Sequence, residues 1–219
     1  MSTEFPANDP AIRHVVLLGD GLGDLPRLQA LDPGSLEGKF MPGRREFWKL
    51  TILPAGDVYR RAPMFALPED ASHVVISIEG NRAIEASGLL QGAPASYQES
   101  LARLSLAADQ FEEVVQSLVE AALATRLPTL ICTMWPPRYP EPVRQRAASA
   151  ALALFNDRIF RRAIEARMSI VDLRIVCPEA ADYADHTLLS KVGLQKAAEA
   201  VSRGLYEISR RGPRTEVFW

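Results

Sequence analysis

Residues 13–24 read RHVVLLGDGLGD, a continuous apolar run that ends abruptly in glycine and aspartate. An uninterrupted run of aliphatic residues is typical of a strand that is buried on both faces of a parallel sheet. Glycine and aspartate in close succession are typical of the loop that follows such a strand. The stretch therefore predicts a first strand over residues 13–19 and a tight loop directly after it.

Further short apolar runs alternate with longer helical patterns along the rest of the chain. Apolar residues recur at helical spacing over residues 98–126 and 142–167. A last helix is expected from about 191 to 210, with Ser190 as its N-cap and Gly212 at its end. This alternation predicts an α/β domain, a three-layer α/β/α sandwich. The other predicted strands are 51–54 (TILP), 73–78 (HVVISI), 129–133 (TLICT) and 169–173 (SIVDL).

The domain is expected to span residues 13–211, between a disordered leader at 1–12 and a C-terminal tail at 212–219. Its 25 basic and 27 acidic side chains give a net charge of -2, so nucleic acid and anionic membranes are not expected partners. No apolar stretch is long enough to cross a bilayer, and the first residues lack a signal core, which predicts a cytoplasmic protein. Cys132 and Cys177 are expected to be buried, reduced thiols, and no residue spacing suggests a metal or another cofactor.

In an open parallel sheet, ligands bind outside the carboxyl ends of the strands. That rule selects the loops after the predicted strands and the segment before the last helix. The first loop lacks the spacing of a dinucleotide fingerprint or a P-loop, so nucleotide binding is not favoured. The site is therefore expected to take a small molecule. Its candidate residues are Asp20, Gly21, Gly56, Asn81, Arg82, Trp135, Tyr139, Asp182, Asp185 and His186.

In their order along the chain, these segments resemble the SGNH/GDSL hydrolase family. VVLLGDG is similar to the first family block, Gly56 falls at the glycine of the second, and SIEGNRAI is similar to the third. Residues 138–185 resemble a bacterial branch with an arginine-proline loop, an asparagine-bearing helix and a VDLR strand in this order. The resemblance covers roughly residues 14–200. It implies a five-stranded parallel sheet in flavodoxin-like order.

In that family, a serine in the first block attacks an acyl carbonyl, and a late Asp-x-x-His supplies the base and its orienting carboxylate. Two backbone N–H groups and the third-block asparagine hold the oxyanion. The resemblance therefore implies oxyanion or substrate-binding roles for Gly21, Gly56 and Asn81. Gly21, however, stands at the position of the serine, and a residue without a side chain cannot form an acyl-enzyme.

The third and last blocks depart from the family as well. Arg82 replaces the usual aspartate and could pair with a ligand carboxylate or with a surface acid. The family's base position falls on Leu188, which cannot accept a proton. The nearest imidazole is His186, which could be a general base oriented by Asp182 or Asp185, or a loop histidine beside an acid.

Four further residues near the strand ends have possible roles in holding or lining the site. Asp20 is expected to hold the first loop by hydrogen bonds, although a raised pKa would make it a base. Trp135 and Tyr139 could wall a pocket, and Trp135 could equally be loop packing. Ser77 is expected to point into the sheet, which makes it a poor substitute nucleophile.

Three functions are consistent with these residues. The first is a repurposed enzyme that stabilises an oxyanion or enolate of a small carbonyl- or carboxylate-bearing substrate, while Asp20 or His186 moves a proton or activates water. The second is a non-catalytic module that binds a small acid or a protein partner. The third is a conventional esterase or acylhydrolase with a replacement nucleophile, for which no residue is well placed. The first is the leading expectation.

Overall fold

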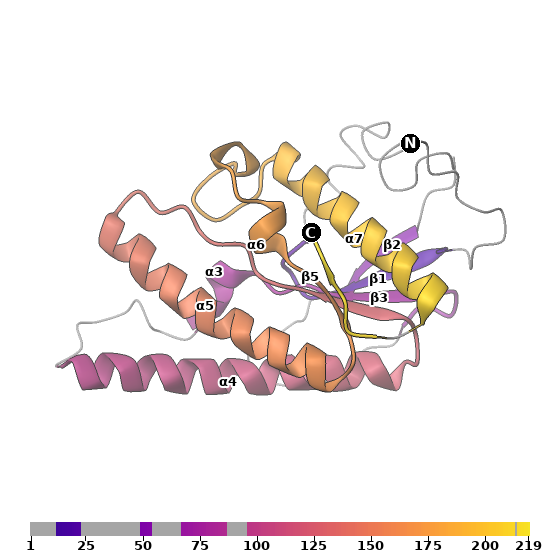
Figure 1. The fold of residues 1–219 in the computed structure, drawn as a ribbon, viewed down its shortest axis with the longest axis horizontal. Coiled ribbons are helices and arrows are strands. Elements are labelled where there is room, and N and C mark those ends of the chain that lie inside the picture. The colour runs from indigo at the N-terminus through magenta and orange to yellow at the C-terminus, as the bar shows by residue number, and fades with distance from the viewer. Residues whose placement is uncertain (1–11, 23–48, 54–66, 87–95, 213) are drawn as a thin grey trace.

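The computed structural model describes residues 12–22, 49–53, 67–86, 96–212 and 214–219. In this part of the chain, six parallel strands form one sheet in the order β2-β1-β3-β4-β5-β6 (Figure 1). The strands are β1 (His14–Leu18), β2 (Lys49–Leu53), β3 (His73–Ile76), β4 (Thr129–Cys132), β5 (Ser169–Val171) and β6 (Val217–Phe218). The helices are α3 (Gly80–Ala86), α4 (Tyr97–Ala124), α5 (Pro142–Glu165), α6 (Leu173–Val176), α7 (Lys191–Arg211) and the 3₁₀ helix η1 (Ala180–Asp182).

The first five strands follow the predicted flavodoxin-like order, so the predicted fold class is confirmed. The predicted number of strands was one too low. Strand β6 pairs in parallel with β5 inside the segment predicted as a tail. A strand of two residues is too short to leave a periodic pattern in the sequence. The leader predicted for residues 1–12 lies, apart from Ile12, outside the described residues.

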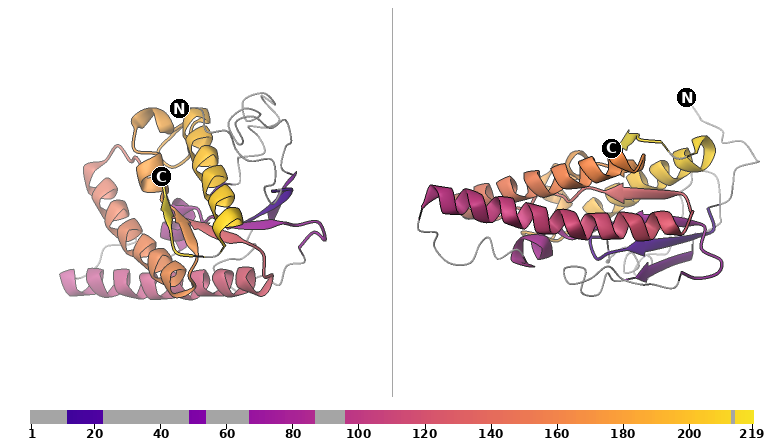
Figure 2. Two further views of the ribbon diagram at one scale, coloured as in Figure 1. Left: turned by 45° about the vertical axis from the view of Figure 1, so that its right-hand side comes forward. Right: turned by 90° about the horizontal axis from the view of Figure 1, so that it is seen from below.

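Helices cover both faces of the sheet, as Figure 2 shows from two further directions. Successive residues of a strand point to opposite faces. Val16 and Leu18 of β1 accordingly pack in the core with α4 and α5, whereas Val15 and Leu17 pack in the core with α7. All five residues of β1 are buried. The uninterrupted apolar sequence is thus explained by burial on both faces.

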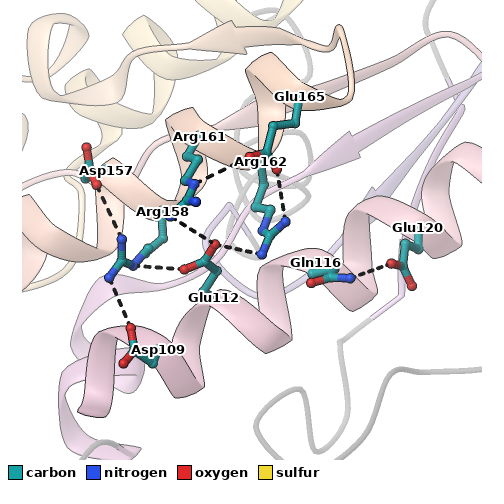
Figure 3. Close-up of polar contacts among 9 residues, drawn as sticks. All are labelled: Asp109, Glu112, Gln116, Glu120, Asp157, Arg158, Arg161, Arg162 and Glu165. Atoms are coloured by element: carbon teal, nitrogen blue, oxygen red, sulfur yellow. Dashed lines mark hydrogen bonds and ion pairs between the residues drawn. The ribbon is translucent and has the colours of Figure 1, made fainter. Parts of the chain in front are cut away.

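Helices α4 and α5 pack against each other through an aromatic pair and a charged network. The rings of Phe111 and Phe155 stack with their centroids 4.7 Å apart. Beside them, Glu112 of α4 lies among Arg158, Arg161 and Arg162 of α5 (Figure 3). This network joins the two helices side by side; the sequence patterns did not predict it.

The two ends of α7 and the state of the two cysteines agree with the sequence pattern. The hydroxyl of Ser190 accepts a hydrogen bond from the Gly193 N–H at the start of α7, and Gly212 ends that helix with a φ of 77°. Cys132 and Cys177 are buried and unpaired, as expected. Among the described residues, no helix is long and apolar enough to cross a membrane.

Candidate functional site

The carboxyl ends of β1 and β3 are joined by backbone hydrogen bonds at one edge of the sheet. The Ser77 N–H donates to the Leu18 carbonyl over 2.9 Å, and the Gly21 N–H donates to the Ser77 carbonyl over 3.0 Å. Gly19 has a φ of +110°, and a Cβ at this position would lie 2.0 Å from the Ser77 carbonyl oxygen. The loop after β1 therefore lies directly against the segment after β3.

Asp20 strengthens this link through its side chain. One carboxylate oxygen accepts from the Glu79 N–H over 3.1 Å, and the other pairs with the Arg82 guanidinium over 2.9 Å. Arg82 also pairs with the Glu79 carboxylate over 3.2 Å, although 61% of its side chain is exposed. Asp20 thus has the loop-holding contacts expected of it. Arg82 has the two acidic neighbours of a surface ion pair.

The residues directly after β3 lie against Gly21. A Cβ on Gly21 would lie 2.4 Å from the Ser77 hydroxyl oxygen and 2.9 Å from the Ile78 carbonyl. Ser77 is 1% exposed, which agrees with its predicted burial. The sequence did not predict that its hydroxyl would lie beside Gly21, because side-chain contacts between strands depend on the register of the sheet.

Two of the three expected oxyanion donors cannot be placed. Gly56 lies outside the described residues, and of Asn81 only the backbone, in the first turn of α3, is described. The third, the Gly21 N–H, already donates to Ser77. An oxyanion role for these three positions stays a prediction.

The predicted acid–base residues lie on or next to the segment that leads into α7. Asp182 is fully buried, and its carboxylate accepts from the Glu179 N–H over 2.9 Å and pairs with the Lys196 ammonium over 2.7 Å. The Asp185 carboxylate accepts from the N–H groups of Thr187 and Leu188, and these hydrogen bonds hold its pKa below the usual value. Both carboxylates therefore hold the segment in shape.

His186 is exposed between these contacts. Its carbonyl accepts from the Arg138 N–H, and its ring lies 6.3 Å, centroid to centroid, from the Tyr139 ring. Trp135 donates its indole N–H to the Thr187 carbonyl over 2.8 Å and is 6% exposed. The segment before α7 and the loop after β4 therefore lie together, as predicted. Trp135 packs in that junction.

A buried network at the ends of β4 and β5 was not predicted, although the VDLR pattern contains part of it. Asp172 accepts from the Thr133 hydroxyl over 3.0 Å and pairs with the Arg174 guanidinium over 2.6 Å. Burial alone would raise the pKa of Asp172, but the contacts with Arg174 and Thr133 lower it. The Asn156 side chain bonds both backbone groups of Met134. These contacts hold the residues that follow β4 and β5 in place.

Solved structures with similar folds are esterases and lipases. An acetyl xylan esterase matches with a TM-score of 0.59 and 15% identity, covering 85% of this chain and 96% of that one. A lipase/acylhydrolase from Enterococcus faecalis matches with a TM-score of 0.55 and 16% identity, over 93% and 100%. A proposed SGNH hydrolase from Slackia heliotrinireducens matches with a TM-score of 0.52 and 15% identity, over 89% and 100%.

At the level of sequence, no protein-family model and no curated protein matches the chain. The likeness therefore rests on three-dimensional structure, and it spans nearly the full length of the proteins compared. The chain has the α/β fold of the SGNH/GDSL hydrolases.

Proposed function

We propose that this chain acts on a small carbonyl- or carboxylate-bearing substrate without an acyl-serine at position 21. Isomerisation, elimination, cyclisation and direct attack by water are reactions of this kind. Each needs stabilisation of developing negative charge and a proton acceptor, and none needs a nucleophilic side chain after β1. The proposed site lies at the carboxyl ends of β1, β3 and β4, where the loops after these strands begin.

The packing around Gly21 is the observation that carries this proposal. A side chain at this position would collide with the Ser77 hydroxyl and the Ile78 carbonyl, at 2.4 and 2.9 Å from the first added carbon. The surroundings are therefore built around a glycine. A serine could be accommodated only if the backbone after β3 moved away, which costs on the order of 1–3 kcal/mol for overpacked interiors.

His186 is the proposed proton-transfer group. Asp20 and Asp182 both carry a positively charged partner and a backbone N–H on their carboxylates. Such contacts occupy the oxygens that a base would use. The imidazole of His186 is exposed on a segment that the carboxylates of Asp182 and Asp185 hold in shape. Histidine is the side chain most often used for proton transfer near neutral pH.

Hydrolysis of short-chain p-nitrophenyl esters by the wild type, Gly21→Ser and His186→Ala tests the proposal. The wild type should turn over without an initial burst and without labelling by a fluorophosphonate. His186→Ala should lose about 10²- to 10⁴-fold in kcat/KM, the range for one acid–base group. Gln110→Ala, on the exposed side of α4, is the control and should match the wild type.

Two results would count against this reading. A burst with a fluorophosphonate adduct on any serine would establish a conventional acyl-serine mechanism. A gain of activity in Gly21→Ser would mean that the other parts of a serine esterase are intact and that only the hydroxyl was missing.

A non-catalytic binding protein is the second candidate. It is favoured by the contacts that already occupy Asp20, Asp182 and the Gly21 N–H. In that case no variant changes turnover, because there is none. Arg82→Ala would then weaken binding of a small acid measured by calorimetry, whereas His186→Ala would leave it unchanged.

A further inference from the structure

An arginine and a histidine lie beside the same tyrosine ring, in the loops that follow β4 and precede α7. The Arg144 guanidinium carbon is 4.1 Å from the centroid of the Tyr139 ring, and the centroid of the His186 ring is 6.3 Å from it. Arg144 belongs to the first turn of α5, Tyr139 to the loop after β4, and His186 to the segment before α7. A cation from α5 is thus brought next to the proposed proton-transfer group.

Hydrogen bonds of the loop after β4 hold these residues together. The Tyr139 N–H donates to the Gln145 side chain over 2.7 Å, which ties the loop to the start of α5. The Arg138 N–H donates to the His186 carbonyl over 2.6 Å, which ties the same loop to the segment before α7. The backbones of Arg144 and His186 are therefore both anchored to the loop that carries Tyr139.

The Arg144 guanidinium has donors left for a ligand. Within the described part of the chain it stacks on the Tyr139 ring and pairs with no carboxylate, not even that of Glu141 one turn earlier. A stacked guanidinium uses its face, whereas its N–H donors point outwards in its plane and match the two oxygens of a carboxylate. Arg144 and His186 are both exposed, so a molecule in solution can reach both groups directly.

Helix stability gives no reason for an arginine at position 144. A positive charge in the first turn of a helix opposes the helix dipole, and the first turn of α5 contains no acidic residue to offset it. Arg210 shows the opposite case: it stacks on Tyr206 with the guanidinium carbon 5.4 Å from the ring centroid, but in the last turn of α7, where a positive charge is favourable. The two arginines therefore share a contact and differ in their place.

We propose that the Arg144 guanidinium binds the carboxylate of a small ligand, and that the Tyr139 ring holds the guanidinium where the bound molecule lies beside the His186 imidazole. This inference rests on the proposed function, because it selects the carboxylate-bearing substrates from the two classes named there. Arg144 is here a binding residue, and no covalent bond to it is formed or broken.

NMR titrations with butyrate and butyramide, an anionic and a neutral probe of equal size, test the inference. The wild type should bind butyrate more tightly than butyramide. Arg144→Gln should lose about threefold to tenfold in butyrate affinity and keep its butyramide affinity, because it removes a charged hydrogen-bond partner. Arg210→Gln is the matched control: it removes the same charge and the same kind of stacking about 30 Å away along α7, and it should bind both probes like the wild type.

The imidazole signals of His186 report where butyrate binds. They are assigned by their absence from the spectrum of His186→Ala, and they should shift in the wild type as butyrate is added. The signals of His14 and His73, which are buried at the starts of β1 and β3, should not shift.

Four outcomes would overturn the inference. They are an unchanged butyrate affinity in Arg144→Gln, an equal loss in Arg210→Gln, a wild type that does not prefer butyrate or binds neither probe, and His186 signals that do not respond to butyrate. Ester turnover is measured separately. The proposed function therefore stands if turnover persists after the Arg144 inference has failed, and it fails alone if butyrate binds through Arg144 in a protein without turnover.

Discussion

Replacing Glu112 by glutamine should cost more stability than any other single charge removal on α4. The Glu112 side chain is only 11% exposed, and the Arg162 and Arg158 guanidinium groups approach it to 2.7 and 3.1 Å (Figure 3). Arg161 adds a longer contact of 3.9 Å. Glu112→Gln keeps the volume of the side chain, so the change removes charge without opening a cavity.

The expected magnitude follows from the exposure of the partners. Loss of one partner from a fully buried ion pair costs about 3–5 kcal/mol, whereas an exposed pair contributes about 0.2–1 kcal/mol. Arg158 and Arg162 are 20% and 28% exposed, so water screens part of the charge that is left unpaired. We therefore expect a loss of about 2–3 kcal/mol in the free energy of unfolding. For a chain of this length that lowers Tm by about 4–12 °C.

Urea denaturation followed by far-UV circular dichroism measures this loss. Glu120→Gln is the matched control: Glu120 lies on the same helix, is exposed, and accepts only from the Gln116 amide over 2.8 Å among the contacts of the described residues. It should cost less than about 0.5 kcal/mol. Equal midpoints for the two variants would contradict this prediction, because the arginines would then contribute no more to α4 than solvent does.

Three further predictions concern buried groups and a helix cap. Burial lowers the pKa of His73 from its usual 6.5 to about 4. The unfolded chain therefore binds more protons between those values, and stability should fall by about 2–3 kcal/mol as the pH drops through that window; urea midpoints should lose this pH dependence in His73→Leu. Ser190→Ala removes the acceptor for the Gly193 N–H and should cost about 1 kcal/mol, measured in the same way. Burial raises the pKa of Cys132 above the usual range and that of Cys177 to about 12, so a disulfide exchange reagent should titrate both thiols in denaturant and neither in the native protein.

Much of the fold could be predicted because burial on both faces of a sheet leaves a direct trace in the sequence. Strand β1 is buried throughout and apolar from its second residue on, and α7 has a serine cap and a glycine end, so their bounds could be expected within a residue or two. Strand β6 left no such trace, because its two residues are too few to form a hydrophobic pattern in the sequence. They form a strand only because they lie beside β5. Glu112 likewise resembles any helix-surface acid until α5 is packed against it.

The candidate site was less predictable, because its residues are adjacent in space and not in sequence. The loops could be selected, since parallel strands bring their carboxyl ends to one edge. The partners could not: nothing in the sequence assigns Lys196 to Asp182 or Arg82 to Asp20. The family resemblance selected position 21 as a site residue, but the place of the Ser77 hydroxyl beside Gly21 depends on the register between β1 and β3.

That register also determines how a serine at position 21 could ever be accommodated. Gly19 and Gly21 both face the backbone after β3. A Cβ added to Gly19 would lie 2.0 Å from a carbonyl oxygen of that backbone, and a Cβ added to Gly21 would lie 2.9 Å from the next carbonyl group. Moving that backbone away would break the hydrogen bond from Ser77 to Leu18 and the one from Glu79 to Asp20. The glycine at position 21 is therefore coupled to the contacts that join two central strands. A single substitution would have to work against all of them, so Gly21→Ser is expected to lose stability without gaining an esterase.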